Sequence, residues 1–222
     1  MINKNLVPAV AGSSGLVGSF LIKNLAKIHT KVISLSRTEI DFENNNVINQ
    51  IIDFDNLEKE IFFRKIDHLY ISLGTTIKKA GNAKNFEKVD YHYCLDLANL
   101  AFKFGVKRLS IVSSVGSNPD SKLLYPRTKG RVEKELAKIG FDHFSIMKPG
   151  IIMGTRKENR MGESLAKLIF KLISPLLICK LSKYKPIHAN LISKAMINIL
   201  NSKEKGIFKL EYTDLTNFSK KF

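Results

Sequence analysis

A tyrosine and a lysine lie four residues apart, at Tyr125 and Lys129. Residues at positions i and i+4 of a helix share one face, so the lysine ammonium is expected beside the phenol. The positive field of the ammonium favours the phenolate, which prepares the phenol to transfer a proton at neutral pH. Ser114 precedes this pair and could hold a substrate oxygen, with Ser113 as the alternative. This set predicts proton transfer at a carbonyl or alcohol oxygen.

A second candidate site is the glycine-rich segment Gly12-Ser-Ser-Gly15-Leu-Val-Gly18. It follows the apolar run Leu6–Ala11 and precedes a segment with helical spacing of apolar residues, so it is expected at a strand-to-helix turn. Glycines there let the backbone approach a pyrophosphate, whose charge is met by the amides of the helix N-terminus. A plain turn is the alternative. We predict a dinucleotide site that includes Gly12, Ser14, Gly15, Leu16, Val17 and Gly18.

The choice of cofactor depends on Arg37, which follows the second predicted strand. An NAD-specific site usually has an acid at this place, which binds the ribose 2′-hydroxyl. A guanidinium suits a 2′-phosphate instead, so we predict NADP rather than NAD. The alternative is that Arg37 is a surface residue and Glu39 acts as the acid. Asp53 and Phe54, at the end of the third predicted strand, are expected to meet the adenine; the alternative is that Asp53 is a loop aspartate without a function.

The elements that must position these residues alternate between strands and helices. Strands are predicted at 6–11, 31–36, 47–54, 68–74, 108–114 and 144–150, and helices at 16–28, 89–105 and 128–140, with 191–200 as the last helix. This alternation is typical of a parallel sheet covered on both faces. We predict an α/β fold, the doubly wound Rossmann architecture, in one domain over residues 1–222.

Five segments of the chain resemble a known family. They are AGSSGLVGS, SLGTTIKKAGNAKNFEKVD, IVSSVGS, YPRTKGRVEKEL and KPGIIMG. Together they resemble the short-chain dehydrogenases/reductases, in the atypical branch that includes the mammalian Tat-interacting oxidoreductase and its bacterial NAD(P)-binding relatives. The resemblance covers about residues 5 to 200.

The resemblance implies roles for further residues. Leu73, Gly74 and Thr75 would line the cofactor, and Pro149, Gly150, Ile151 and Ile152 would pass beside the nicotinamide. Ser114, Tyr125 and Lys129 would form the proton-transfer set, with Lys129 also binding the nicotinamide ribose. Asp90 departs from the pattern, because many dehydrogenases of the superfamily carry asparagine there.

Composition limits the partners and the location. The chain has a formal charge of +16, but its basic residues are scattered and mostly lysine, so we expect solvated surface and no nucleic-acid partner. Cys94 and Cys179 form no CxxC pair, and His188 has no evident metal partner, so no metal site is predicted. The cysteines suggest a reducing compartment, and the first residues lack a signal peptide's pattern, so we expect a cytoplasmic protein.

The most apolar stretch is GESLAKLIFKLISPLLICKL, at residues 162–181. Lys167, Lys171 and Pro175 interrupt it, so we predict no transmembrane segment. A helix on the substrate cleft, a homodimer surface and a helix on a membrane surface are the three alternatives. Residues 155–190 are predicted to form a small substrate-side insertion.

Two functions follow from these observations. The first is an NADP-dependent oxidoreductase that transfers hydride between NADPH and an unidentified small-molecule carbonyl or alcohol. The second is a non-catalytic NADP(H)-binding redox sensor or regulatory protein. The retention of Ser114, Tyr125 and Lys129 favours the enzyme, because a sensor has no need of all three.

Overall fold

The central element of the fold is a parallel sheet. The computed structural model describes residues 3–57, 66–154 and 179–221. Within these ranges the sheet has seven strands in the order β3-β2-β1-β4-β5-β6-β9. Their bounds are β1 Pro8–Ala11, β2 Val32–Ser36, β3 Val47–Ile51, β4 His68–Ile71, β5 Arg108–Val112, β6 His143–Met147 and β9 Gly206–Leu210. The order 3-2-1-4-5-6 with all strands parallel is that of the doubly wound nucleotide-binding fold, so the predicted fold class is confirmed.

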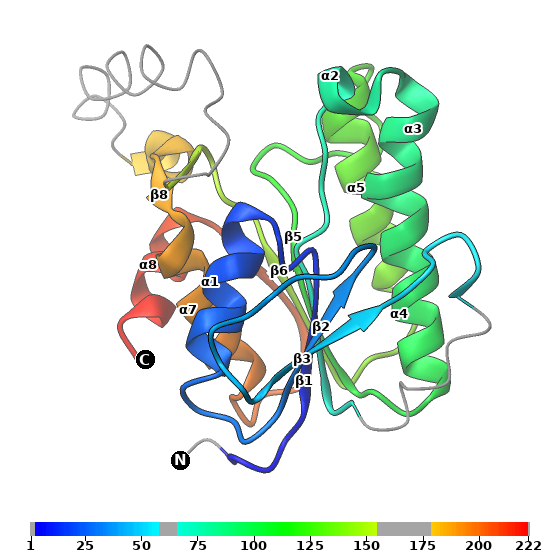
Figure 1. Ribbon diagram of the computed structural model, residues 1–222. Coiled ribbons are helices and arrows are strands. Elements are labelled where there is room, and N and C mark those ends of the chain that lie inside the picture. Colours follow the sequence, from blue (N-terminus) through cyan, green and yellow to red (C-terminus); the bar gives the residue numbers. More distant parts are fainter. Residues whose placement is uncertain (1–2, 58–65, 155–178, 222) are drawn as a thin grey trace.

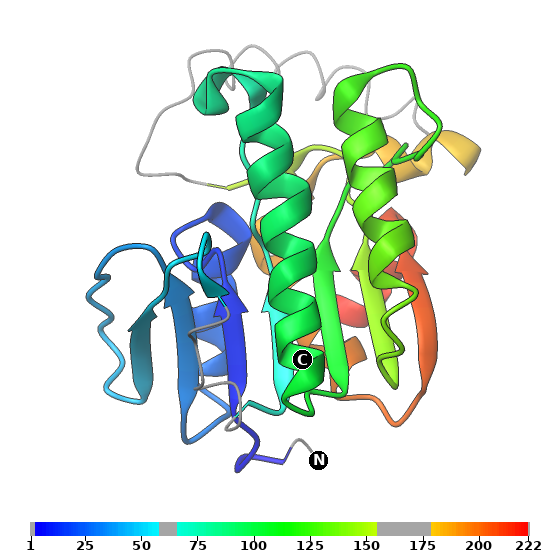
Figure 2. The same cartoon turned by 90° about the vertical axis from the view of Figure 1, so that its right-hand side faces the viewer.

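Helices cover both faces of the sheet. One face carries α1 (Leu16–Leu25), α7 (Ala189–Leu200) and α8 (Tyr212–Ser219), and the other carries α4 (Tyr93–Lys103) and α5 (Leu124–Leu136). Figure 2 shows α4 and α5 lying side by side across the strands. Strands β1, β2, β4 and β6 are buried over their whole length, which requires apolar contacts on both sides.

The strand order changes direction between β1 and β4, which marks where a ligand crevice is expected at the carboxyl ends of the strands. On that side the chain adds the short helices α2 (Ile77–Ala80) and α3 (Ala83–Glu87), visible at the top of Figure 1. A small second sheet pairs β7 (Ile152–Met153) with β8 (Ile187–His188), just after the 3₁₀ helix η5 (Cys179–Tyr184).

The structure differs from several of the predicted elements. The strand predicted over 47–54 ends at Ile51, and a turn follows at Phe54 and Asp55. The helix predicted over 89–105 continues a longer helix that begins at Ala83 and contains a π-helical turn, η3 (Lys88–His92). The prediction that 191–200 is the last helix is wrong, since β9 and α8 follow it. β9 is largely exposed and so has no continuous apolar run.

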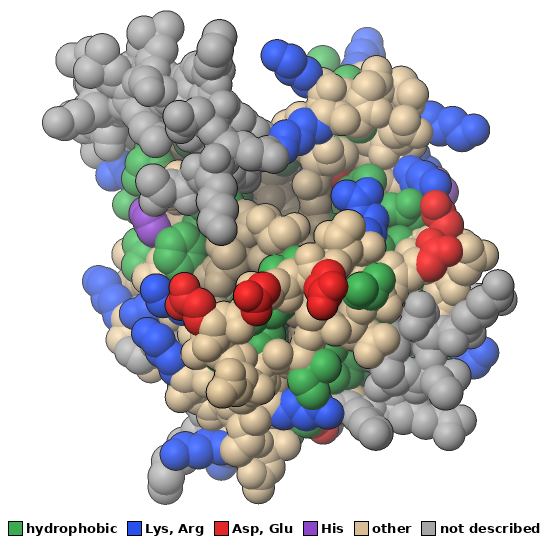
Figure 3. Space-filling view, viewed as in Figure 1, with side chains coloured by type: hydrophobic (Ala, Val, Ile, Leu, Met, Phe, Trp, Pro, Cys, Tyr) green, Lys and Arg blue, Asp and Glu red, His purple; other side chains and the backbone are tan. Residues whose placement is uncertain are grey.

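The described residues carry basic side chains over much of the surface. Figure 3 shows lysines and arginines spread from top to bottom of the face in view rather than gathered in one stripe. No helix in the described ranges is long and apolar enough to cross a membrane. The predicted insertion at 155–190 falls largely outside the described residues, as does most of the apolar stretch at 162–181.

Candidate functional site

The glycine-rich turn joins β1 to α1 and has the tight geometry that its sequence predicts. Gly12 has φ of +83°, and a Cβ atom there would lie 2.7 Å from the backbone of Ser72. A Cβ atom on Gly18 would lie 2.0 Å from the carbonyl oxygen of Gly12, so helix and turn are in direct backbone contact. At Gly15 the nearest atom to a Cβ is 3.1 Å away. Gly12 and Gly18 are therefore required by packing, whereas Gly15 is less constrained by the protein itself.

The N-terminus of α1 is open to an anion. Gly15 is the N-cap residue, and it has no side chain that could accept a hydrogen bond from the amides of the first turn. Uncapped amides and the helix dipole attract negative charge. The side chains of Leu16 and Val17 are buried, so these two residues would offer a ligand only their backbone, whereas Ser14 is exposed. The turn therefore has the shape and charge that a pyrophosphate requires.

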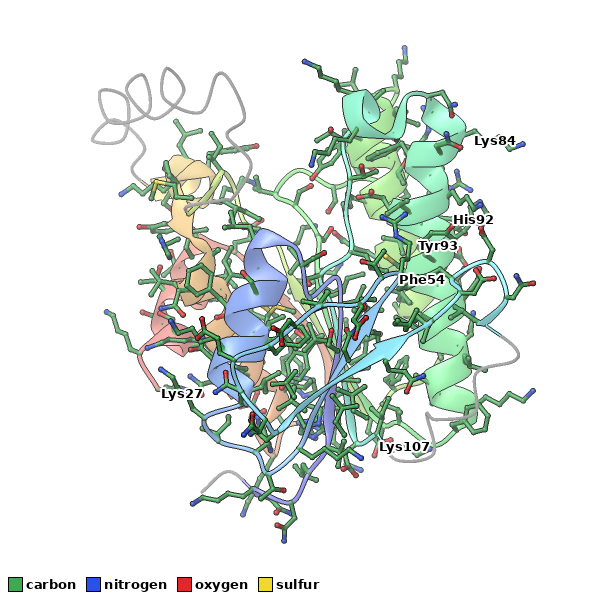
Figure 4. The ribbon with its side chains drawn as sticks, viewed as in Figure 1. Lys27, Phe54, Lys84, His92, Tyr93 and Lys107 are labelled. Atoms are coloured by element: carbon green, nitrogen blue, oxygen red, sulfur yellow. The ribbon has the colours of Figure 1, made fainter. Side chains whose placement is uncertain are left out.

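A pocket of about 360 Å³ lies beside β2 and β3, and it brings together three residues predicted for the adenosine end of a cofactor. These are Arg37, which is exposed, together with Asp53 and Phe54. The Phe54 ring is buried and packs on Tyr93 of α4 with centroids 5.2 Å apart; Figure 4 labels both. The full lining is Arg37, Ile51, Ile52, Asp53, Phe54, Asp55 and Tyr93.

The wall of this pocket carries an ion pair that the sequence did not predict. Asp55 accepts a hydrogen bond of 2.9 Å from the Tyr93 hydroxyl and lies 2.7 Å from Nζ of Lys88. These contacts, first from Lys88 and then from Tyr93, lower the pKa of Asp55. Residues of the β3 loop and of η3 and α4 are thereby held together around the pocket.

Tyr125 and Lys129 share one face of α5, which begins at Leu124 rather than at the predicted residue 128 and has Pro126 in its first turn. Tyr125 is 42% exposed, with its ring 5.9 Å from that of Phe86 on α3. Lys129 is buried, and its Nζ atom lies 2.8 Å from Oδ1 of Asp90 in η3. The phenol is therefore accessible to a substrate, while the ammonium lies inside the site.

The loop after β4 lies against this ion pair. The backbone amide of Thr75 donates a hydrogen bond of 2.8 Å to Oδ2 of Asp90. A Cβ atom on Gly74 would lie 3.5 Å from Oδ1 of Asp90 and 3.9 Å from Nζ of Lys129. The structure thus brings together Gly74, Thr75 and Lys129, which the resemblance placed at the cofactor, with Leu73 preceding them.

Burial and the neighbouring charges shift the pKa of Lys129 in opposite directions. Burial lowers the pKa of Lys129, but the Asp90 carboxylate, followed by Tyr125 and Cys94, raises it more, so that it reaches about 12. Burial raises the pKa of the Cys94 thiol to about 12 as well. Lys129 is therefore charged and Cys94 is neutral at physiological pH.

Ser113 and Ser114, the two alternatives for the substrate-binding serine, differ in their hydrogen bonds. The Ser113 hydroxyl donates to the buried carboxylate of Glu133, which also accepts from Ser117 and pairs with Lys148 at 3.2 Å. The Ser114 hydroxyl is buried and has no hydrogen-bond partner within the described residues. Ser114 is thus the serine available to a ligand.

The segment after β6 lies next to Ser114. The amide of Val115 donates to the carbonyl of Pro149 over 2.9 Å, which joins the ends of β5 and β6. Ile151 accepts a hydrogen bond from Ile187, and a Cβ atom on Gly150 would lie 2.8 Å from the Tyr184 carbonyl oxygen. Pro149, Gly150, Ile151 and Ile152 therefore border the same end of the sheet.

Sequence reasoning missed part of this arrangement. It noted Asp90 only as a departure from a pattern, and it did not foresee Glu133, Lys148 or Tyr93 near the site. The contacts of these residues join positions far apart in the chain, so no local spacing signals them. The acidic residue at position 90 was the one signal in the sequence of a charged partner for Lys129.

The strand order and the helices on both faces define the chain as an α/β protein with the Rossmann-type fold. Solved structures with the same fold include a UDP-glucose 4-epimerase from Thermotoga maritima, with a TM-score of 0.69 and 14% identity over 97% of this chain and 82% of that chain. Another is MoeE5, solved with UDP-glucose and NAD, with a TM-score of 0.67 and 10% identity over 96% of this chain and 81% of that chain. At these identities the likeness concerns the fold alone.

The chain belongs to the HIM1 family, whose model matches residues 42–182. Protein HTATIP2 of Rattus norvegicus is 36% identical over 77% of this chain and 72% of its own length. Protein FMP52 of Candida albicans, named mitochondrial, is 34% identical over 89% of this chain and 88% of its own length. The predicted resemblance to the Tat-interacting branch is confirmed.

The comparisons also correct one prediction. The expectation of a cytoplasmic protein is wrong, because several FMP52 relatives, including those of Candida albicans and Lodderomyces elongisporus, are named mitochondrial proteins. Two cysteines and the absence of a signal-peptide pattern are compatible with more than one compartment, so they were insufficient to fix the location.

Proposed function

We propose that this protein is an NADP(H)-dependent oxidoreductase acting on a carbonyl or alcohol. The observation that carries the proposal is the convergence of Lys129, the Gly74–Thr75 loop and the unpartnered hydroxyl of Ser114 at the carboxyl end of the sheet. The exposed phenol of Tyr125 lies on the same helix as Lys129. A buried hydroxyl without a partner among the described residues is available to hydrogen-bond a ligand.

The residues present fit a dinucleotide. Gly12, Gly15 and the uncapped end of α1 would hold the pyrophosphate, and the pocket at Arg37 and Asp53 would hold the adenosine end. A guanidinium at Arg37 favours the 2′-phosphate of NADP over the hydroxyl of NAD. Lys129 would bind the nicotinamide ribose. When bound, the dinucleotide supplies or accepts the hydride.

The protein side chains handle the proton. In the direction of reduction, Tyr125 donates its phenolic proton to the carbonyl oxygen while the carbonyl carbon receives a hydride. Ser114 donates a hydrogen bond to the same oxygen and orients it. Lys129 stabilises the phenolate that remains. In the direction of oxidation, the phenolate takes the proton of the alcohol.

Two measurements test this proposal. Nucleotides released from the purified, denatured protein are identified by mass spectrometry, and calorimetry measures the affinity for NADPH. A screen of carbonyl compounds then follows the absorbance of NADPH. We expect NADP(H) to be bound and at least one carbonyl to be reduced. A protein that binds no dinucleotide contradicts the proposal, and tight binding without turnover would favour the redox-sensor alternative.

The location proposed in place of the cytoplasm is the mitochondrion. It is supported by the names of the FMP52 relatives. Expression of the tagged chain followed by organelle fractionation tests it.

A further inference from the structure

Asp90 lies at the centre of the site and is almost completely buried, with a side-chain exposure of 1%. Each of its carboxylate oxygens has its own contact. Oδ1 lies 2.8 Å from Nζ of Lys129, and Oδ2 accepts a 2.8 Å hydrogen bond from the Thr75 amide. One carboxylate therefore joins helix α5 to the loop that follows β4.

The backbone around Asp90 is unusual. It lies in the π-helical turn η3, inside a helix that runs from Ala83 to Lys103. A π turn interrupts the regular spacing of a helix, and such turns occur often at functional sites. Its flanking residues Val89 and Tyr91 are only partly buried, whereas Asp90 is directed into the site.

Asp90 also sets the charge of the site. The groups that act on Lys129 in the described structure are Asp90, Tyr125 and Cys94. Cys94 is neutral, because burial raises the pKa of its thiol. Asp90 is therefore the acid that balances the buried ammonium, and an asparagine at this position would leave a net positive charge beside Gly74 and Thr75.

We propose that Asp90 is a positioning residue that holds Lys129 against the Gly74–Thr75 loop and whose negative charge favours the oxidised form of the bound nicotinamide cofactor. This inference rests on the proposed function. The nicotinamide ring of NADP⁺ is positively charged and that of NADPH is neutral, so a nearby carboxylate stabilises the oxidised form selectively. Charges act over longer distances in a site shielded from water than in bulk solvent.

The test compares Asp90→Asn with the parent protein. Asparagine keeps the size of the side chain and removes its charge. Calorimetry measures the dissociation constants for NADP⁺ and NADPH separately. We expect the ratio of the NADP⁺ to the NADPH dissociation constant to rise by about three- to tenfold in Asp90→Asn, as expected for losing one charge at close range.

Glu87→Gln is the matched control. Glu87 lies on the same continuous helix and pairs with Arg131 at 3.2 Å, but this pair is partly exposed. Solvent screens such a charge, so the ratio should stay unchanged in Glu87→Gln. A merely structural role of Asp90 would weaken the binding of both cofactor forms equally.

The outcomes separate the two proposals. If the parent binds both forms and the ratio is the same in Asp90→Asn, the inference is overturned and the proposed function stands. If the parent protein binds neither NADP⁺ nor NADPH, both the proposed function and the inference about Asp90 are wrong. If Asp90→Asn does not fold, NMR of the lysine ammonium groups in the parent replaces it. The signal of the Lys129 ammonium is identified by its absence from the spectrum of Lys129→Met. This signal should then differ between the NADP⁺ and NADPH complexes, and an identical signal in both complexes would overturn the inference.

Discussion

Ser113 and Ser114 are neighbours in the chain, but only the hydroxyl of Ser113 is bound within the protein, where it donates to the Glu133 carboxylate. The hydroxyl of Ser114 is also buried and has no partner in the described ranges. The two serines therefore differ in hydrogen bonding although they are neighbours in the chain.

Substitution of each serine separates these functions. Ser113→Ala removes a hydrogen bond from a buried carboxylate, so the free energy of unfolding should fall by about 1–3 kcal/mol while turnover persists. Ser114→Ala removes a hydroxyl without a partner, so stability should change little while turnover falls by about 10²-fold. Urea unfolding and a carbonyl-reduction assay measure the two effects. Loss of turnover in Ser113→Ala alone would reverse the assignment.

The glycine-rich turn offers a second pair of substitutions. A Cβ atom at Gly15 lies 3.1 Å from the Gly12 carbonyl oxygen and 3.9 Å from that of Ser72, so Gly15→Val should fold but lose NADPH binding by tenfold or more. Gly18→Ala places a Cβ atom 2.0 Å from the Gly12 carbonyl oxygen, so it should lower stability by about 1–3 kcal/mol or more. Circular dichroism and calorimetry check both. Unchanged NADPH affinity in a folded Gly15→Val protein would place the pyrophosphate elsewhere.

Arg37 is expected to select between cofactors. It is exposed at the pocket beside β2 and β3, where a guanidinium would suit the 2′-phosphate of the proposed cofactor. Arg37→Ala should weaken NADPH binding by about tenfold or more and leave NADH binding nearly unchanged. Lys27→Ala is the control, since Lys27 lies far from Phe54 and Tyr93 in Figure 4. A parent protein that prefers NADH would contradict this prediction.

Much of the fold could be predicted from local sequence patterns, because each buried strand is a short apolar run. Strand β1, the glycine-rich turn and helix α1 also follow one another directly in the chain, so their arrangement was predictable. The relative position of Tyr125 and Lys129 was also predictable, because residues four apart in a helix lie on the same face. The edge strand β9 was missed because it is mostly exposed. Helix α8 was missed although Glu211 and Asp214 form a capping box, a local signal that could have revealed it.

The partner of Lys129 could not be predicted in the same way. The contact between Lys129 and Asp90 depends on the packing of η3 against α5 and on the π turn. No periodic pattern of residues in the sequence indicates either feature. The choice between Ser113 and Ser114 likewise depends on Glu133, a residue of the next helix. Tertiary packing, not residue spacing, decided these features.

Acid should destabilise the protein through its buried histidines. Burial, followed by the charges of Arg108, His29 and His143, lowers the pKa of His68 to about 3, and burial also lowers those of His29 and His143. A histidine that stays neutral when folded takes up a proton on unfolding below pH 6.5. Stability is therefore unaffected above that pH and falls between pH 6.5 and about 3, by roughly 1.4 kcal/mol per pH unit for His68.

Urea unfolding at pH 7 and pH 5 measures this effect. His68→Gln should lose less stability between the two pH values than the parent does, whatever its stability at pH 7. His92→Gln, at an exposed histidine, should keep the pH dependence of the parent. Identical pH dependence in His68→Gln and the parent would show that His68 does not contribute.

The central claim is that Tyr125 transfers a proton while the rest of the site binds NADP(H). Tyr125→Phe keeps the ring and its contact with Phe86 but removes the hydroxyl. The most direct measurement compares this variant with the parent, using calorimetry for NADPH affinity and NADPH absorbance for the reduction of an accepted carbonyl. We predict equal affinity and a rate lower by about 10²–10⁴-fold. Equal rates in the two proteins would contradict the account.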